Sequence, residues 1–195
     1  MKQRFATLSS RSLRSGFDRS TDKLWSEQRL TWQGAPASEK DWNVLPDTMV
    51  SVHFREVQRA IGGLLRYRRF NDRTVFVFPG GVPALGFRQG TTETTAGRAV
   101  VTLRILGGVL ARRSSTYGTL QLGVSRDVVD DQNVHYSAWQ VVEDYPSRFL
   151  HVSRFPAVGL VAGIAGRIYR AYHAKVSFRS LQRIQESLQE SAENE

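Results

Sequence analysis

Side chains that can exchange protons lie close together at two places in this chain. Asp130 and Asp131 lie just before His135, so a carboxylate can orient the imidazole as a general base. Glu143 and Asp144 are adjacent, and two carboxylates in a cleft can divide acid and base roles between them. Both groups also fit polar turns beside strands, and this second interpretation is the one that we favour.

Other catalytic or cofactor chemistry finds no support in the sequence. The chain has no cysteine, which excludes disulfides, thiol nucleophiles and thiolate metal sites. The glycine pairs Gly80-Gly81 and Gly107-Gly108 lack the spacing of a phosphate-binding loop and are expected to be turns. No histidine is spaced from another histidine or a carboxylate as metal ligands on one helix face would be; the four are His53, His135, His151 and His173.

We therefore expect a protein with no catalytic residue, no metal and no cofactor. An enzyme would require His135 or His151 to point into a cleft beside a carboxylate. This alternative stays open, because one sequence does not place these side chains in space.

Aromatic and apolar side chains from Phe87 onward can line a cavity. Ligand pockets are lined mostly by such residues, with a few polar groups that orient the ligand. The same residues can also fill a core. The candidates for a ligand-binding cavity are Phe87, Tyr117, Tyr136, Trp139, Ile168 and Tyr172.

Three arginines are candidates for an anion site: Arg126, Arg148 and Arg154. Arg148 and Arg154 lie on one face of their expected strand, and guanidinium groups bind anionic head groups. Aromatic and basic residues also alternate over 66–70 and 167–170, a combination that can bind single-stranded nucleic acid. No RNA- or DNA-binding motif accompanies them, and solvated arginines on an outer face are the simpler explanation.

The composition indicates a globular, basic protein of one domain. The 195 residues carry a net charge of +9 with a pI of about 10.4, and 41% of them are hydrophobic. A basic surface can meet nucleic acid or an anionic membrane surface, although arginines scattered over a solvated surface give the same net charge. No apolar stretch reaches the length of a membrane span.

Two helices and a series of strands must position these residues. An apolar stripe with helical spacing predicts a helix from Asp47 or Thr48 to Arg66–Arg69, and a second stripe predicts a long helix from Ala157 to about Gln189. Between and before them, alternating residues predict short strands with turn residues in the links. These strands are 25–33, 74–78, 84–93, 98–106, 116–126, 134–143 and 148–155.

The expected fold class is α+β: an antiparallel β-meander of about six or seven strands packed on a long C-terminal helix, similar to the helix-grip arrangement. We expect residues 1–23 to be a mobile basic arm or a targeting segment, 24–190 a single domain, and 191–195 a frayed acidic tail. The expected location is the cytoplasm. The alternative is an organelle, because the N-terminus is rich in arginine and serine and poor in acids.

A few local patterns resemble a known family. Tyr117-Gly-Thr-Leu120 is followed by Val152-Ser-Arg-Phe-Pro156 and a helix rich in glycine, alanine and arginine, and Leu30-Thr31-Trp32 lies near the start. These residues resemble the domain-of-unknown-function "nineteen-ninety" family of bacteria and plants. The resemblance covers only the C-terminal part of this chain. The chain departs from that family where Gln121–Ser125 replaces a Pro-Gly-His-Pro and acidic stretch, and where Phe155 precedes Pro156. The resemblance implies no known reaction.

Together these patterns predict binding of a small apolar or amphipathic, lipid-like ligand in a cavity between the sheet and the C-terminal helix. The alternative is a basic interaction protein that contacts RNA or an anionic membrane through its arginines. That alternative requires the arginines to converge on one face.

Overall fold

A computed structural model describes residues 10–18, 23–60, 64–111, 118–130, 133–146 and 159–193. Within the last range, side chains are described at 171 and 174–190.

Eight antiparallel strands form one sheet in the order β1-β2-β8-β7-β6-β5-β4-β3. From β3 to β8 each strand pairs with the next, as a meander does, and β2 then adds to β8 at the far side. The strands are β1 Ser10–Asp18, β2 Lys23–Gly34, β3 Arg66–Arg69, β4 Arg73–Val77, β5 Pro83–Thr95, β6 Arg98–Gly107, β7 Thr119–Val128 and β8 Val134–Pro146.

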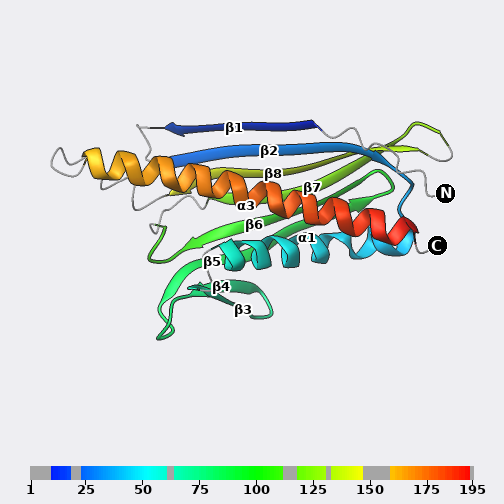
Figure 1. Ribbon diagram of the computed structural model, residues 1–195. Helices are drawn as coiled ribbons and strands as arrows, with labels where there is room; N and C mark the ends of the chain where they lie inside the picture. Colours follow the sequence, from blue (N-terminus) through cyan, green and yellow to red (C-terminus); the bar gives the residue numbers. More distant parts are fainter. Residues whose placement is uncertain are drawn as a thin grey trace.

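Both helices, α1 Glu39–Ala60 and α3 Gly159–Glu193, cover the same face of this sheet (Figure 1). The long helix α3 packs over β2 and β8, whereas α1 packs over β6, β7 and the β3–β5 end of the sheet. The two helices also contact each other. The predicted α+β, helix-grip-like fold is therefore confirmed, with eight strands and a second covering helix.

Alternation along the strands divides the sheet into a helix-facing inner face and an outer face. On β2 the even-numbered residues from Leu24 to Trp32 are buried, whereas Trp25 and Arg29 are exposed. The register of the paired strands extends this division to the whole sheet, because residues directly opposite each other lie on the same face. The inner face thus receives the even-numbered residues of β7 and β8 and the odd-numbered residues of β6.

The core lies between the inner face and the two helices. Phe54 of α1 packs on Phe76 and Phe87, with ring centroids 5.3 and 5.2 Å away. On the α3 side, Leu181 and Ile184 are buried in the same core. Phe54, Leu181 and Ile184, which belong to the apolar stripes predicted for the two helices, therefore face the sheet.

The first helix begins earlier than the sequence analysis predicted. Ser38 caps it: the Asp41 N–H donates to Ser38 Oγ over 3.2 Å, and Ser38 Oγ donates to the Asp41 carboxylate over 2.7 Å. This reciprocal pair satisfies helix N-terminal donors and starts the helix before Pro46, which lies inside it. The segment predicted as a loop before Asp47 is therefore helical.

Two other expectations are wrong in part. Residues 10–18 of the expected arm form the strand β1, which pairs with β2 along its whole length. Arg66–Arg69, expected to end the first helix, forms the short strand β3 on β4. The strand predicted over 148–155 lies outside the described residues.

No helix in the described part of the chain combines the length and the apolar character that a membrane span requires.

Candidate functional site

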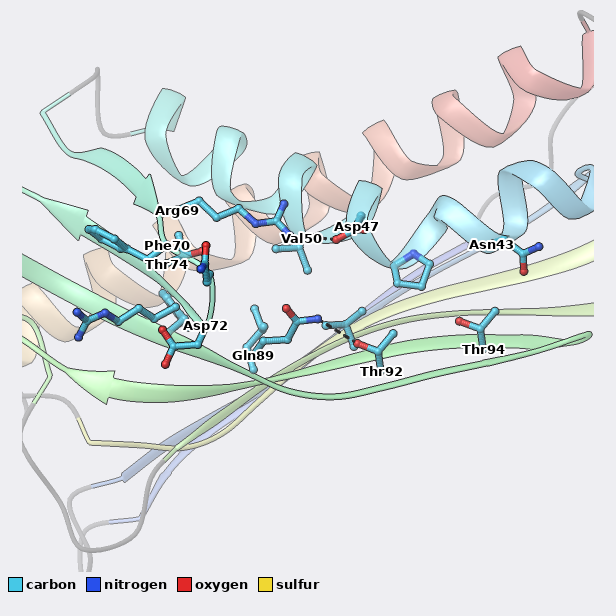
Figure 2. Close-up of a pocket in the computed structure, with 16 residues that line it drawn as sticks. Asn43, Asp47, Val50, Arg69, Phe70, Asp72, Thr74, Gln89, Thr92 and Thr94 are labelled. Atoms are coloured by element: carbon cyan, nitrogen blue, oxygen red, sulfur yellow. Dashed lines mark hydrogen bonds and ion pairs between the residues drawn. The ribbon is translucent and has the colours of Figure 1, made fainter.

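A pocket of about 170 Å³ lies between α1 and the end of the sheet formed by β4, β5 and β6. Figure 2 shows Asn43, Asp47 and Val50 of α1 on one side and Gln89, Thr92 and Thr94 of β5 on the other. The turn between β3 and β4 completes the wall with residues 69–74. The pocket therefore lies under the first helix and not under α3, where the sequence analysis expected it.

The pocket is lined by both apolar and polar side chains, and the polar ones are here called its rim. The apolar lining residues are Pro46, Val50, Phe70, Phe87, Val101 and Leu103. The polar ones are Asn43, Asp47, Arg69, Asn71, Asp72, Arg73, Thr74, Gln89, Thr92 and Thr94. A lining with both kinds of side chain is suited to a ligand that has both kinds of surface.

The carboxylates at the rim are already paired. Arg69 donates to the Asp47 carboxylate over 3.1 Å, which links the β3 strand to α1 across the pocket mouth (Figure 2). The Asp72 carboxylate lies 3.5 Å from Arg88 Nε. Gln89 Nε2 donates to Thr92 Oγ1 over 3.4 Å. The rim thus offers hydrogen-bonding groups but no unpaired carboxylate to act as a base.

Of the predicted cavity residues, Phe87 lines this pocket. Tyr136 lies on the inner face but over the other half of the sheet, where its ring stacks on Trp32. Tyr117 and the side chains of Ile168 and Tyr172 lie outside the described residues. Their part in a cavity stays a prediction.

Trp139 lies on the outer face, so its proposed place in a helix-facing cavity is wrong. It is three residues from Tyr136 along β8, and an odd step places two residues on opposite faces of a strand. Its indole packs over Gly123, donates to Gln121 Oε1 over 3.1 Å, and lies beneath the guanidinium groups of Arg29 and Arg98.

The Tyr136 hydroxyl holds the loop between β2 and α1. It accepts a hydrogen bond from the Ala37 N–H over 2.8 Å and donates one to the Ala35 carbonyl over 2.9 Å. Burial raises the pKa of Tyr136, although the Ala37 hydrogen bond and the Arg126 charge oppose that shift. The hydroxyl is therefore protonated at neutral pH and has a structural role.

The Arg126 guanidinium is engaged within the protein, and its role in the predicted anion site stays a prediction. Its guanidinium donates to the Ala96 carbonyl over 2.7 Å and to the Ala37 carbonyl over 2.9 Å. It also stacks on Trp42, 4.3 Å from the ring centroid. Arg148 and Arg154, its expected partners, lie outside the described residues.

Among the proton-exchange candidates, Asp130, Glu143 and Asp144 form local bonds, as the simpler interpretation expected, whereas Asp131 lies outside the described residues. The Asp130 carboxylate accepts from the Asn133 amide over 3.0 Å, inside the β7–β8 turn. Asp144 pairs with Lys23 at 2.9 Å, and Glu143 accepts from Thr119 over 3.4 Å. In the described ranges no group of three histidine or acidic side chains is placed to hold a metal ion.

A buried polar cluster, which the sequence analysis missed, lies between α3 and the strands β2 and β8. Gln140 Nε2 donates to Ser177 Oγ of α3 over 2.8 Å. Gln28 stands directly opposite Gln140, and the Oε1 atoms of both, like Ser180 Oγ, are buried without a hydrogen-bond partner among the described residues. This polar cluster consists of Ser26, Gln28, Gln140, Ser177 and Ser180.

No family model and no curated protein matches this chain. The resemblance to the "nineteen-ninety" family therefore stays a prediction, and two of its three motifs fall wholly or partly outside the described residues.

Solved structures share the helix-grip-like arrangement of elements only loosely. Protein XoxI from Bacillus cereus is 8% identical, with 83% of this chain and 94% of that chain covered and a TM-score of 0.40. A norcoclaurine synthase point mutant from Thalictrum flavum, in complex with a transition-state analogue, is 12% identical, with coverage of 92% and 98% and a TM-score of 0.35. Human STARD10 is 7% identical, with coverage of 89% and 76% and a TM-score of 0.28. At such scores the functional argument depends on this chain's own residues.

Proposed function

We propose that this protein binds a small amphipathic ligand in the pocket between α1 and strands β4–β6, without chemical conversion. The observation that carries the proposal is a lining that combines apolar side chains, including Phe87 and Val101, with amide and hydroxyl groups. Such a site buries an apolar body and orients a polar substituent.

The volume limits the size of the ligand. A pocket of about 170 Å³ is close to the engineered cavities of about 150 Å³ that bind benzene, and below the usual range for larger ligands. We therefore narrow the expected lipid-like ligand to a molecule with about one ring, or a short branched chain, that carries hydroxyl or amide groups.

The acidic groups at the rim are in ion pairs, which supports binding without catalysis. Asp47 is paired with Arg69, and Asp72 lies within ion-pair distance of Arg88. Each of these carboxylates therefore already has a cationic partner within the protein.

A substitution that fills the pocket tests this proposal. Thr92 lines the pocket, whereas Thr102 lies on the outer face opposite Gln121 of β7. With 4-fluorophenol as the probe, we expect ¹⁹F line broadening and a saturable shift with the natural protein and with Thr102→Phe. We expect neither with Thr92→Phe. Equal binding by all three proteins would reject the pocket as the site.

A further inference from the structure

Three arginines stand in a row across the outer face of the sheet. Arg73 of β4 is directly opposite Arg88 of β5, and Arg88 is directly opposite Arg104 of β6. All three residues are exposed. Adjacent strands lie about 4.8 Å apart, so these three positive charges, here called the arginine row, fall within about 10 Å.

This arrangement is unfavourable unless an anion offsets it. Like charges at directly opposed positions of an antiparallel pair destabilise the sheet. Here the repulsion occurs twice in succession, at the pairs Arg73–Arg88 and Arg88–Arg104. The next residues along the row are Thr119 of β7 and then Glu143 of β8, which lies two strands away from Arg104.

Within the protein the arginine row is only weakly neutralised. Among the described residues, the single carboxylate in ion-pair distance is that of Asp72, at 3.5 Å from Arg88 Nε. Both of those side chains are more than half exposed. The Arg73 guanidinium lies over the Phe70 ring, 5.4 Å from its centroid, and a ring supplies no net charge.

A guanidinium group is suited to phosphate, because it can donate two parallel hydrogen bonds to two of the phosphate oxygens. We propose that the arginine row is a binding site for phosphate esters, either as free phosphorylated small molecules or as the head group of an anionic phospholipid. Arg88 and Arg104 lie on the opposite face of the sheet from Phe87 and Leu103, whereas Arg73 also borders the pocket under α1.

Two other outer-face arginines do not offer the same site. Arg29 and Arg98 lie over the indole of Trp139, with the guanidinium carbons 5.9 and 5.4 Å from the ring centroid. Arg29 also lies near the Glu27 carboxylate, at 3.5 Å. The proposal therefore names the arginine row and not the basic surface as a whole.

The test uses the full chain and compares Arg88→Gln, Arg104→Gln and the double variant with Arg55→Gln and Arg179→Gln. The two controls remove the same charge from exposed positions on α1 and α3. The probes are inorganic pyrophosphate, phosphatidylcholine vesicles with and without phosphatidic acid, and single-stranded oligouridylate. Binding is measured by calorimetry and vesicle co-sedimentation. The melting temperature of each protein is measured as well.

We expect pyrophosphate or phosphatidic acid vesicles to bind the natural protein and both controls equally. Each substitution in the arginine row should weaken binding about tenfold, as the loss of a charge-assisted hydrogen bond does. Arg104→Lys should bind with intermediate affinity, since it keeps the charge and loses the paired donors. Without an anion, Arg88→Gln should raise the melting temperature, because it removes two repulsive pairs.

The probes distinguish the two possible sources of the phosphate group. Binding of pyrophosphate without vesicle binding identifies a free phosphate ester, and phosphatidic acid-dependent vesicle binding that the double variant loses identifies a lipid head group. Three outcomes overturn the proposal: no binding of either probe, equal losses in the row variants and the controls, or preferential binding of oligouridylate.

Discussion

Trp32 and Tyr136 stand directly opposite each other on β2 and β8, and their rings stack with centroids 5.1 Å apart and planes 13° from parallel. This stack brings the Tyr136 hydroxyl beneath the loop that leads into α1, where it bonds to Ala35 and Ala37. One tyrosine thus connects the sheet to the start of the helix that roofs the pocket.

Replacement of Tyr136 by phenylalanine is predicted to destabilise the fold. The buried Ala37 N–H loses its acceptor, and an unsatisfied buried donor costs about 1–3 kcal/mol. Urea unfolding should show a lower midpoint for Tyr136→Phe, with Tyr67→Phe on β3 as a control that changes it little. Equal midpoints for Tyr136→Phe and the natural protein would contradict the role of this hydroxyl.

The same tyrosine predicts a dependence of stability on alkaline pH. Because burial raises the pKa of Tyr136 above its ordinary value of 10.0, the unfolded chain releases this proton first as the pH rises. The stabilisation is complete below pH 10 and declines from there up to the folded-state pKa. The unfolding free energy measured against pH should therefore fall less steeply above pH 10 in Tyr136→Phe than in the natural protein.

The hydrogen bond between Gln140 and Ser177 is predicted to couple α3 to the sheet. Ser177→Ala removes the acceptor of a buried amide and should cost about 1–3 kcal/mol. Gln140→Leu should cost a similar amount, but the double variant should cost less than the sum by about 1 kcal/mol, because neither partner is then left alone. Strict additivity in a double-mutant cycle would show that the two side chains act independently.

Close packing on the outer face is predicted to make Gly123 sensitive to a methyl group. A Cβ at this position would overlap the Trp139 indole, and such overpacking costs about 1–3 kcal/mol. At Gly34 the nearest atom to an added Cβ is 3.7 Å away, so Gly34→Ala is the matched control. Denaturation midpoints should fall for Gly123→Ala and stay near the natural value for Gly34→Ala.

Alternation and helical spacing were sufficient to predict most of the fold. The strands β4 to β8 and the helix α3 begin within about three residues of their predicted starts, because one face of each is buried and its apolar residues repeat with the expected period. The elements that were missed have no such pattern: β1 reads Ser-Arg-Ser-Leu-Arg-Ser, and β3 reads Arg-Tyr-Arg-Arg. Both lie at sheet edges, where strands need little apolar surface.

Two other errors were avoidable from the sequence. Ser38 and Asp41 have the spacing of a capping pair, which places a helix start before Pro46 and not after it. Tyr136 and Trp139 are an odd number of residues apart on one strand, so only one of them can face the helices.

The pocket itself was not predictable, because its walls come from separate elements. Asp47 and Arg69 meet only when β3 folds back beside α1, and Phe87 joins them through the pairing of β4 with β5. The polar cluster at Gln28 and Gln140 was likewise not predictable from the sequence, since polar residues in a strand are normally expected on the solvent side.

Amide chemical-shift mapping with 4-fluorophenol tests the central proposal most directly. In ¹H–¹⁵N spectra of the isotope-labelled full chain, we predict saturable shifts at Thr74, Gln89 and Val101, which line the pocket. Gln28 and Gln140, beneath α3, should stay unchanged. Shifts that gather at Gln28 and Gln140 instead, or no saturable shift at any residue, would contradict a ligand site between α1 and the sheet.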